Sequence, residues 1–306
     1  MISVIIPVYN ESKNIKLLYE ELYGVLKKIQ QKFEIIIVND GSTDDTLSEL
    51  KKLSNITIIS MRRSFGQTAC IDAGVKCAKG QVVVTMDGDL QNDPHDIPRM
   101  LEALNYCDGV IGWRKQRKDT ISKRLFSFFA RKLRKLLFND ELHDAGCGLK
   151  VIKKKCFSNL DLYGEMHRFM HLILISRGFS VTEIPVKHRQ RMSGKTNYDW
   201  TRTIKAFADM LSVLFWRKFS NRPLHLFGSL GFILILIGLF GTVSLAIVHL
   251  IYNTPYETML LVIFSTIILG GIQLFVSGIA IDIAIKSLYS TKTEEPYYIK
   301  SIVRKK

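Results

Sequence analysis

Two long uncharged stretches near the carboxyl end limit what this chain can fold into. Residues 224–252 contain no Asp, Glu, Lys or Arg, and residues 259–285 contain only Asp282. A helix needs about 20 consecutive apolar residues to cross the hydrocarbon core of a bilayer, and each stretch is longer than that. The sequence therefore predicts two transmembrane helices over residues 223–288, joined by a short connector at 253–258.

Basic residues flank the two predicted spans on one side. Arg217, Lys218 and Arg222 precede the first span, Lys286 and Lys292 follow the second, and the connector contains no Lys or Arg. Because cytoplasmic flanks carry the excess of Lys and Arg, we expect an integral membrane protein whose large N-terminal domain (1–200) and basic tail (289–306) are both cytoplasmic.

The first 200 residues alternate between short apolar runs and segments with a helical pattern. The runs lie at 3–7, 34–38, 57–60, 82–86 and 109–112, and the helical segments lie near 12–30, 43–53, 66–79 and 95–105. This order predicts an α/β domain with a mostly parallel sheet. Ligands of such sheets bind at the carboxyl ends of the strands, so the residues that follow each run are the candidates for a site.

Acidic residues follow three of the predicted strands. Glu11 comes after the first and Asp40 after the second, where they are candidates for a base or a ribose contact. Ser42 or Thr43 is expected to cap the helix that follows, since hydroxyl side chains favour that position.

The third acidic group follows the fourth predicted strand. Asp87, Asp89 and Gln91 are spaced two residues apart and offer a compact set of oxygen atoms. Such hard oxygen ligands suit Mg²⁺ or Mn²⁺, and either ion would neutralise charge on a diphosphate leaving group. The five cysteines, in contrast, show no metal-ligand spacing.

Five ordered segments resemble glycosyltransferase family 2 enzymes of the GT-A fold, in the group of dolichyl-phosphate mannosyltransferase and the bacterial polyprenyl-phosphate glucosyltransferases. The segments are residues 4–11, 38–44, 62–66, 86–91 and 163–169. The resemblance runs through almost the whole chain and includes the paired helices at its end. It implies a GT-A (Rossmann-like) catalytic domain followed by two transmembrane helices.

The resemblance also implies roles for individual residues. It assigns a nucleotide-sugar pocket to Pro7, Tyr9, Glu11, Asp40 and Asp87, and a metal site to Asp87, Asp89 and Gln91. Arg114 would lie near the phosphates, and Asp144 would be an acid beside the sugar or the acceptor, although a connector aspartate is the alternative. Residues 191–197 resemble a loop that closes over phosphates; Arg191 matches it, Thr196 and Asn197 depart from it, and Lys195 supplies a displaced charge.

Two segments have the pattern of helices that lie on a membrane surface. Residues 121–138 place leucine and phenylalanine on one face and Arg131, Arg134 and Lys135 on another, which favours an interfacial helix over one packed on the protein core. Residues 201–222 form a second, juxtamembrane candidate. With a formal net charge of +15, the chain suits an anionic membrane and phosphate-rich substrates.

These observations and the resemblance together predict a metal-dependent inverting hexosyltransferase. It would move a hexose or N-acetylhexosamine from a nucleotide-diphosphate sugar to polyprenyl phosphate for cell-envelope glycan modification, and the resemblance to bacterial enzymes favours a uridine-linked donor. The expected partners are these two substrates, the bilayer and, as the resemblance implies, further copies of the chain in a homo-oligomer. Nucleic acid is not expected, because the aromatic residues lie on apparent membrane helices. Two alternatives remain: a catalytically silent membrane scaffold, and an enzyme with another membrane acceptor.

Overall fold

The computed structural model describes residues 1–115, 135, 142–144, 146–158, 160, 162, 164–190, 215, 223–252, 255 and 258–291. The chain divides into two compact units, Met1–Val213 and Leu214–Lys306. Each unit is described below by itself.

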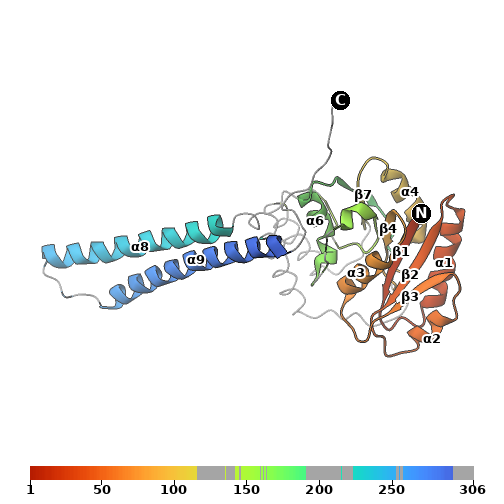
Figure 1. Cartoon of the computed structure of the whole chain (residues 1–306), viewed down its shortest axis with the longest axis horizontal. Coiled ribbons are helices and arrows are strands. Elements are labelled where there is room, and N and C mark those ends of the chain that lie inside the picture. The colour runs from red at the N-terminus through yellow and green to blue at the C-terminus, as the bar shows by residue number, and fades with distance from the viewer. Residues whose placement is uncertain are drawn as a thin grey trace, which may run out of the picture. The chain divides into compact units, whose positions relative to one another are not determined.

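The first unit is built on a seven-stranded sheet, counted over the described residues (Figure 1). The strand order is β3-β2-β1-β4-β6-β5-β7. All neighbouring strands run parallel except β6, which is antiparallel to β4 and β5. The strands are β1 (Ile2–Val8), β2 (Phe33–Asn39), β3 (Ile56–Ser60), β4 (Val82–Thr85), β5 (Gly109–Trp113), β6 (Lys150–Lys153) and β7 (Val181–Pro185).

The order of the first four strands creates a switch point in the sheet. From β1 the chain adds β2 and then β3 on one side, and it returns to add β4 on the other side of β1. The connections that leave β1 and β4 therefore diverge at the carboxyl ends of these strands. Open α/β sheets bind ligands in the crevice that such a divergence leaves.

Helices cover both faces of the sheet. They are α1 (Ile15–Lys28), α2 (Thr46–Lys51), α3 (Gln67–Cys77), η1 (Pro94–Asp96), α4 (Ile97–Ala103), η2 (Lys154–Phe157), η3 (Met166–Arg168) and α6 (Met170–Ser176). Helix α1 buries Leu18, Leu22 and Leu26, which are four residues apart and so share one face of the helix.

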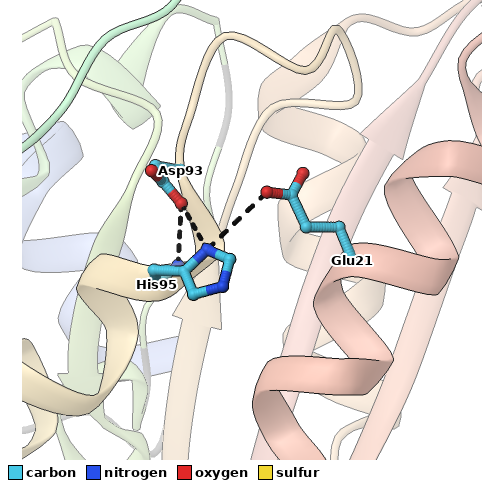
Figure 2. Close-up of side chains that lie close together, drawn as sticks. All are labelled: Glu21, Asp93 and His95. Atoms are coloured by element: carbon cyan, nitrogen blue, oxygen red, sulfur yellow. Dashed lines mark hydrogen bonds and ion pairs between the residues drawn. The ribbon is translucent and has the colours of Figure 1, made fainter.

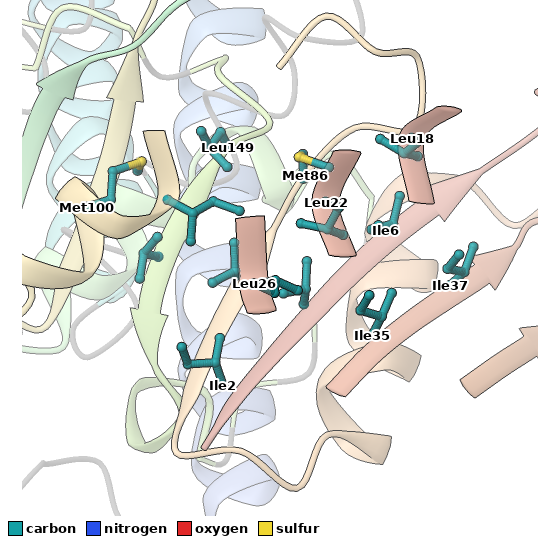
Figure 3. Close-up of a cluster of buried hydrophobic side chains, with 14 of the residues drawn as sticks. Ile2, Ile6, Leu18, Leu22, Leu26, Ile35, Ile37, Met86, Met100 and Leu149 are labelled. Carbon is teal, nitrogen blue, oxygen red and sulfur yellow. The ribbon is translucent and has the colours of Figure 1, made fainter. Parts of the chain in front are cut away.

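The alternation of side chains along β1 gives the two faces their cores. Ile2 and Ile6 point to the α1 face, where Figure 3 shows them with Ile35 of β2 and the leucines of α1. Ile5 points to the other face and packs with the residues of α3. There Gly74 allows α3 to approach closely, because a Cβ at this position would lie 2.4 Å from a methyl carbon of Ile5.

The second unit contains two long helices, α8 (Pro223–Tyr252) and α9 (Thr258–Thr291). Figure 1 shows them side by side. Their backbones meet at Gly231 and Gly271, where a Cβ on either residue would lie within 2.7 Å of the carbonyl oxygen of the other. Small residues allow this close packing of helices in lipid.

Both helices are long and apolar enough to cross a membrane, and little of either is buried inside the protein. The two helices are therefore much less buried than the core helices of soluble proteins. Their exposed side chains, which include Phe232, Phe240 and Leu250, are those that a hydrocarbon environment favours. These features favour membrane anchoring.

Most elements of the sheet match the sequence prediction. The five predicted strands all occur within two residues of their expected ends, and the sheet is mostly parallel as expected. The sequence pattern did not predict β6 and β7, nor that β6 enters the sheet antiparallel between β4 and β5. The predicted surface helices at 121–138 and 201–222 lie outside the described residues, except for residues 135 and 215, as does most of the 289–306 tail.

Candidate active site

A cavity of about 260 Å³ opens at the switch point of the sheet. Its walls come from the segments that follow β1, β2 and β4, together with the start of α3. The lining residues are Pro7, Val8, Tyr9, Glu11, Asp40, Gln67, Asp87, Gly88 and Asp89. Six of the residues singled out from the sequence therefore lie in one cavity, although they are up to 82 positions apart in the chain.

The carboxylate of Asp40 organises the loop that leads into α3. It accepts hydrogen bonds from the backbone N–H groups of Phe65 (2.7 Å) and Gly66 (3.0 Å) and from the hydroxyl of Ser64 (2.8 Å). Next to it, Gly41 has a φ of +67°, and a Cβ there would lie 2.5 Å from the backbone of Arg63. Asp40 thus holds the wall of the cavity in place besides lining it.

The segments that follow β1 and β2 are joined to each other by side chains. Asn10, in the left-handed region at φ 55°, accepts a hydrogen bond from the N–H of Thr43 (2.8 Å), and its own N–H donates to the hydroxyl of Ser42 (3.0 Å). The expectation that Ser42 or Thr43 caps the next helix is therefore wrong. Helix α2 begins at Thr46, whose N–H donates to Asp44 (3.0 Å).

Asp87 and Asp89 place two carboxylates at the floor of the cavity. Asp87 accepts a hydrogen bond from the side-chain amide of Gln67 (2.7 Å), and Asp89 accepts one from the N–H of Gln91 (3.1 Å). Burial raises the pKa of Asp87, and the negative charge of Asp89 raises it further. A divalent cation would relieve both effects, so this pair of oxygen ligands fits Mg²⁺ or Mn²⁺.

The third predicted metal ligand, Gln91, is not among the residues that line the cavity. Its side-chain amide lies 3.5 Å from the backbone carbonyl of Arg189. A role for Gln91 at the metal remains a prediction.

Arg114 and Asp144 form a two-pronged ion pair beside the metal candidates. The guanidinium donates from Nε to Oδ2 (2.6 Å) and from Nη2 to Oδ1 (2.9 Å), and the Arg114 N–H adds a third bond at 3.2 Å. Both side chains are only 12% exposed. Burial alone would lower the pKa of Arg114, but the bonds to Asp144 raise it, so the arginine stays charged. Neither Arg114 nor Asp144 is among the residues that line the cavity at the switch point.

The neighbours of this ion pair also contact each other. The rings of Trp113 and His143 stack with centroids 4.3 Å apart. Glu183 of β7 accepts a hydrogen bond from the N–H of His143 (2.7 Å). The dipeptides 113–114 and 143–144 are thus joined twice, once by ring stacking and once by the ion pair.

Lys150 was not predicted as a site residue, although its ammonium is close enough to Asp87 and Asp144 to feel the charge of both. This first residue of β6 is 4% exposed, and its ammonium donates to the carbonyl of Cys147. Burial lowers the pKa of Lys150, whereas the charge of Asp87 acts in the opposite direction. The only sequence signal was its place at the end of the segment 144–150, which is glycine-rich and therefore able to pack tightly.

Gly148 in the same segment lies directly against Asp87. A Cβ at this position would lie 2.1 Å from Oδ2 of Asp87. The hydroxyl of Thr85 fixes the segment by donating to the carbonyl of Gly148 (2.9 Å). The segment that carries Asp144 and the carboxylate of Asp87 are therefore in contact.

A second group of metal-type ligands lies outside the cavity. Figure 2 shows Glu21 on α1 and Asp93 and His95 after β4 pointing toward one another. A cation already lies between the two acids, because the guanidinium of Arg189 contacts Glu21 at 2.6 Å and Asp93 at 2.9 Å. This group therefore fits a metal poorly. Of the other predicted residues, Arg191 and Lys195 lie outside the described part of the chain.

Comparisons with known proteins agree with this architecture. The family described as Glycosyl transferase family 2 matches residues 3–161. Dodecaprenyl-phosphate galacturonate synthase of Rhizobium johnstonii is 32% identical, over 98% of this chain and 92% of that protein. Undecaprenyl-phosphate 4-deoxy-4-formamido-L-arabinose transferase of Pseudomonas savastanoi is 27% identical, over 99% of this chain and 91% of that protein.

A solved structure extends the comparison to the fold. Glucosyl-3-phosphoglycerate synthase of Mycobacterium tuberculosis, determined with Mn²⁺, uridine diphosphate and phosphoglyceric acid, superposes with a TM-score of 0.58. It is 17% identical, and the match covers 70% of this chain and 78% of that one. This likeness bears on the fold alone, and it confirms the predicted GT-A class.

Proposed function

Because the chain belongs to glycosyltransferase family 2, as its sequence motifs predicted, we propose that it transfers a sugar from a nucleotide-diphosphate sugar to polyprenyl phosphate. The observation that carries this proposal is the cavity at the switch point, where six predicted donor-site residues meet. The two polyprenyl-phosphate relatives, which match over nearly the whole chain, support the choice of acceptor.

On the donor side, each wall of the cavity would contact a different part of the nucleotide sugar. Tyr9, Glu11 and Asp40 would contact the nucleoside, and Asp87 and Asp89 would hold Mg²⁺ or Mn²⁺ against the diphosphate. When bound, the ion would stabilise the negative charge that develops on the departing nucleoside diphosphate. Gln67 fixes the orientation of the Asp87 carboxylate through its 2.7 Å hydrogen bond.

On the acceptor side, the lipid phosphate would be the nucleophile. Its second pKa lies near 6, so it is ionised at neutral pH and needs no strong general base. An oxygen of the phosphate forms a bond to the anomeric carbon as the bond to the diphosphate oxygen breaks. The products are a polyprenyl-phosphate sugar with inverted configuration and a free nucleoside diphosphate.

The ion pair of Arg114 and Asp144 would position this acceptor. Because both carboxylate oxygens of Asp144 bind the guanidinium, its proposed role is to orient Arg114 rather than to remove a proton. A fixed arginine is well suited to a phosphate, which it can contact through two N–H groups. Arg191 and Lys195 would add positive charge over the donor phosphates.

The sugar is the least constrained part of the proposal. A hexose or N-acetylhexosamine linked to uridine was expected, but the relatives named above act on galacturonate and on a formamido-arabinose. The proposal therefore covers a uronic acid or an amino-pentose as well as a hexose.

The two apolar helices would hold the enzyme at the membrane that contains its lipid acceptor. The distribution of Lys and Arg around them favours a cytoplasmic catalytic domain and tail. Residues 121–138 and 201–222 would lie on the membrane surface. Assembly of several copies through the membrane helices remains a further prediction.

A donor panel tests the proposal. The full-length protein in detergent is incubated with Mn²⁺, a short-chain polyprenyl phosphate and one nucleotide sugar at a time. The panel consists of uridine-linked hexose, N-acetylhexosamine, uronic acid and formamido-arabinose, with a guanosine-linked hexose as comparison. We expect one donor to give a lipid whose mass rises by one sugar residue. No product from any donor, together with no binding of any nucleotide sugar, would favour the silent scaffold.

A further inference from the structure

The loop that carries the proposed metal ligands has an unfavourable backbone conformation. Leu90, between Asp89 and Gln91, has a φ of +63°, in the left-handed region that side chains other than glycine avoid. The side chain of Leu90 is buried, so contacts with the surrounding protein hold the residue in this conformation. Strained residues at functional sites persist only where the surrounding structure holds them.

Residues 188–189, late in the first unit, hold this loop through backbone contacts. Asn92 and His188 form an antiparallel β-bridge, and the N–H of Arg189 donates to the carbonyl of Gln91 (2.9 Å). The side chain of Asn92 in turn accepts a hydrogen bond from the N–H of Asp87 (3.1 Å). The loop is therefore closed on itself and fastened to residues 188–189.

The side chain of Arg189 fastens the same segment to two further elements. Its two terminal nitrogens contact the two carboxylate oxygens of Glu21, at 2.8 Å and 2.6 Å. One of them also lies 2.9 Å from the carboxylate of Asp93. Glu21 belongs to α1. Asp93 follows the loop of Asp89 to Gln91, and its carboxylate caps η1 by accepting a hydrogen bond from the N–H of His95 (3.0 Å).

The two acids of this contact are buried or nearly so, while the arginine is partly hydrated. Asp93 is 7% exposed and Glu21 is 19% exposed, whereas the Arg189 side chain is 39% exposed, so the contact depends on its geometry more than on burial. An arginine bound to both oxygens of one carboxylate has a fixed geometry that a lysine cannot reproduce.

A metal ion bound by Glu21, Asp93 and His95 explains this cluster less well than the contact with Arg189 does. Arg189 already supplies the positive charge between Glu21 and Asp93, and His95, the remaining potential ligand, is 57% exposed. Its Nδ1 lies 2.8 Å from Asp93 and 3.6 Å from Glu21, which are hydrogen-bond and ion-pair distances rather than a metal-ligand arrangement (Figure 2).

We propose that Arg189, fastened to Glu21 and Asp93, is a positioning residue that holds the Asp89–Gln91 loop in its metal-binding conformation. The inference rests on the proposed metal-dependent transfer. Arg189 is not among the residues that line the cavity, and its segment meets the loop through the hydrogen bond from its backbone N–H to the carbonyl of Gln91 (2.9 Å). Residues that support metal ligands in this way typically change metal affinity about 10-fold to 100-fold when they are replaced.

The fold does not depend on this contact alone. The N–H of Lys187 donates to Asp96 (2.8 Å), and the N–H of Val186 donates to the carbonyl of Trp113 (2.8 Å). These bonds attach the segment to η1 and to β5 without Arg189. Variants at position 189 are therefore expected to fold.

The test measures Mn²⁺ binding directly, without turnover. Free Mn²⁺ is quantified by electron paramagnetic resonance during titration of the full-length protein, with and without uridine diphosphate. Arg189→Lys and Glu21→Gln should each weaken Mn²⁺ binding about 10-fold, in the range typical of residues that support metal ligands. The double variant should bind no more weakly than Arg189→Lys alone, because the contact that Glu21→Gln removes is one that Arg189→Lys already disrupts.

Two control variants separate this role from general destabilisation and from a second metal site. Arg99→Lys alters another arginine, which pairs with Asp96 at 2.9 Å and also contacts the carbonyl of Pro185, but which does not contact Gln91. His95→Ala removes the exposed candidate ligand. Both should bind Mn²⁺ like the wild type, and circular dichroism should show all variants folded at the assay temperature.

The outcomes distinguish this inference from the proposed function. A wild type that binds Mn²⁺ while Arg189→Lys binds it equally well refutes the positioning role alone. Loss of one bound Mn²⁺ in His95→Ala also overturns it, in favour of a metal at Glu21, Asp93 and His95. A wild type that binds no Mn²⁺ under either condition refutes the metal site of the proposed function, and the positioning role with it.

Discussion

Replacing Gly148 with alanine tests whether the position of the Asp87 carboxylate decides activity. The new Cβ would lie 2.1 Å from Oδ2 and 2.3 Å from Cγ of Asp87, although Cβ atoms in proteins do not approach other heavy atoms within 3.0 Å. The glycine has no positive φ that alanine would resist. The substitution therefore acts by steric contact rather than through backbone strain.

The structure indicates which side of this contact yields. The segment around Gly148 is fixed by the bond from Thr85 (2.9 Å) and by the bond from the N–H of Gly112 to the carbonyl of Leu149 (3.0 Å). Within the described part of the chain, the Asp87 side chain accepts one hydrogen bond, from Gln67, besides the attraction of the nearby charges of Lys150 and Arg114. We expect the carboxylate to move by about 1 Å, and a displacement of that size in a catalytic site can cost about 100-fold in rate.

The assay compares Gly148→Ala with a matched substitution elsewhere. We expect kcat for sugar transfer to fall about 100-fold, with weaker Mn²⁺ binding and a stability loss of about 1–3 kcal/mol from overpacking. Gly24→Ala is the control, because nothing lies within 4 Å of the added Cβ and the residue is inside α1. It should keep full activity and raise Tm slightly, since alanine favours helices over glycine by about 1 kcal/mol. Near-normal turnover and Mn²⁺ affinity in Gly148→Ala would refute the proposed role of Asp87.

Three further predictions concern the metal, the acceptor and stability. Asp89→Ala should abolish metal-dependent transfer, as should removal of divalent cations with a chelator; turnover that survives both would contradict the metal site. Arg114→Lys should raise KM for polyprenyl phosphate about 10-fold or more, because lysine cannot reproduce the two-pronged bond to Asp144; an unchanged KM would remove Arg114 from the acceptor site. Burial would raise the pKa of Asp108, but hydrogen bonds from Lys155, Ser180 and Lys153 hold it below the usual value. Its stabilising contribution is therefore present at neutral pH and lost as pH falls below about 4, so the Tm difference between wild type and Asp108→Asn should shrink on acidification.

The parallel part of the sheet could be predicted because its signals are local. Short runs rich in Val and Ile mark β1 to β5, and acidic residues soon after β1, β2 and β4 mark the carboxyl ends of those strands. Strand β6 was not predicted, because its pattern is short and begins with the buried Lys150, which looks polar in sequence. Its place between β4 and β5 depends on pairing partners at least 39 residues away in the chain, such as Ile111 with Lys150 and Val84 with Val151.

The candidate site divides in the same way. Strand ends determine the positions of Asp40, Asp87 and Asp89, so the order of motifs was enough to predict that these acids meet. The contacts of Arg189 with Glu21 join residues 168 positions apart, and no local pattern records such a pair. The binding of Ser42 and Thr43 to Asn10, in place of helix capping, likewise depends on the neighbouring strand.

The acceptor is the central claim, and one comparison tests it most directly. The full-length enzyme, supplied with Mn²⁺ and the donor found in the panel, is given either a short-chain polyprenyl phosphate or the polyprenol of the same length without phosphate. The account predicts that only the phosphate accepts the sugar, giving a glycosyl phosphodiester detectable by mass and by ³¹P resonance, with one nucleoside diphosphate released per product. Equal transfer to the polyprenol, or release of the nucleoside diphosphate without a glycosylated lipid phosphate, would contradict it.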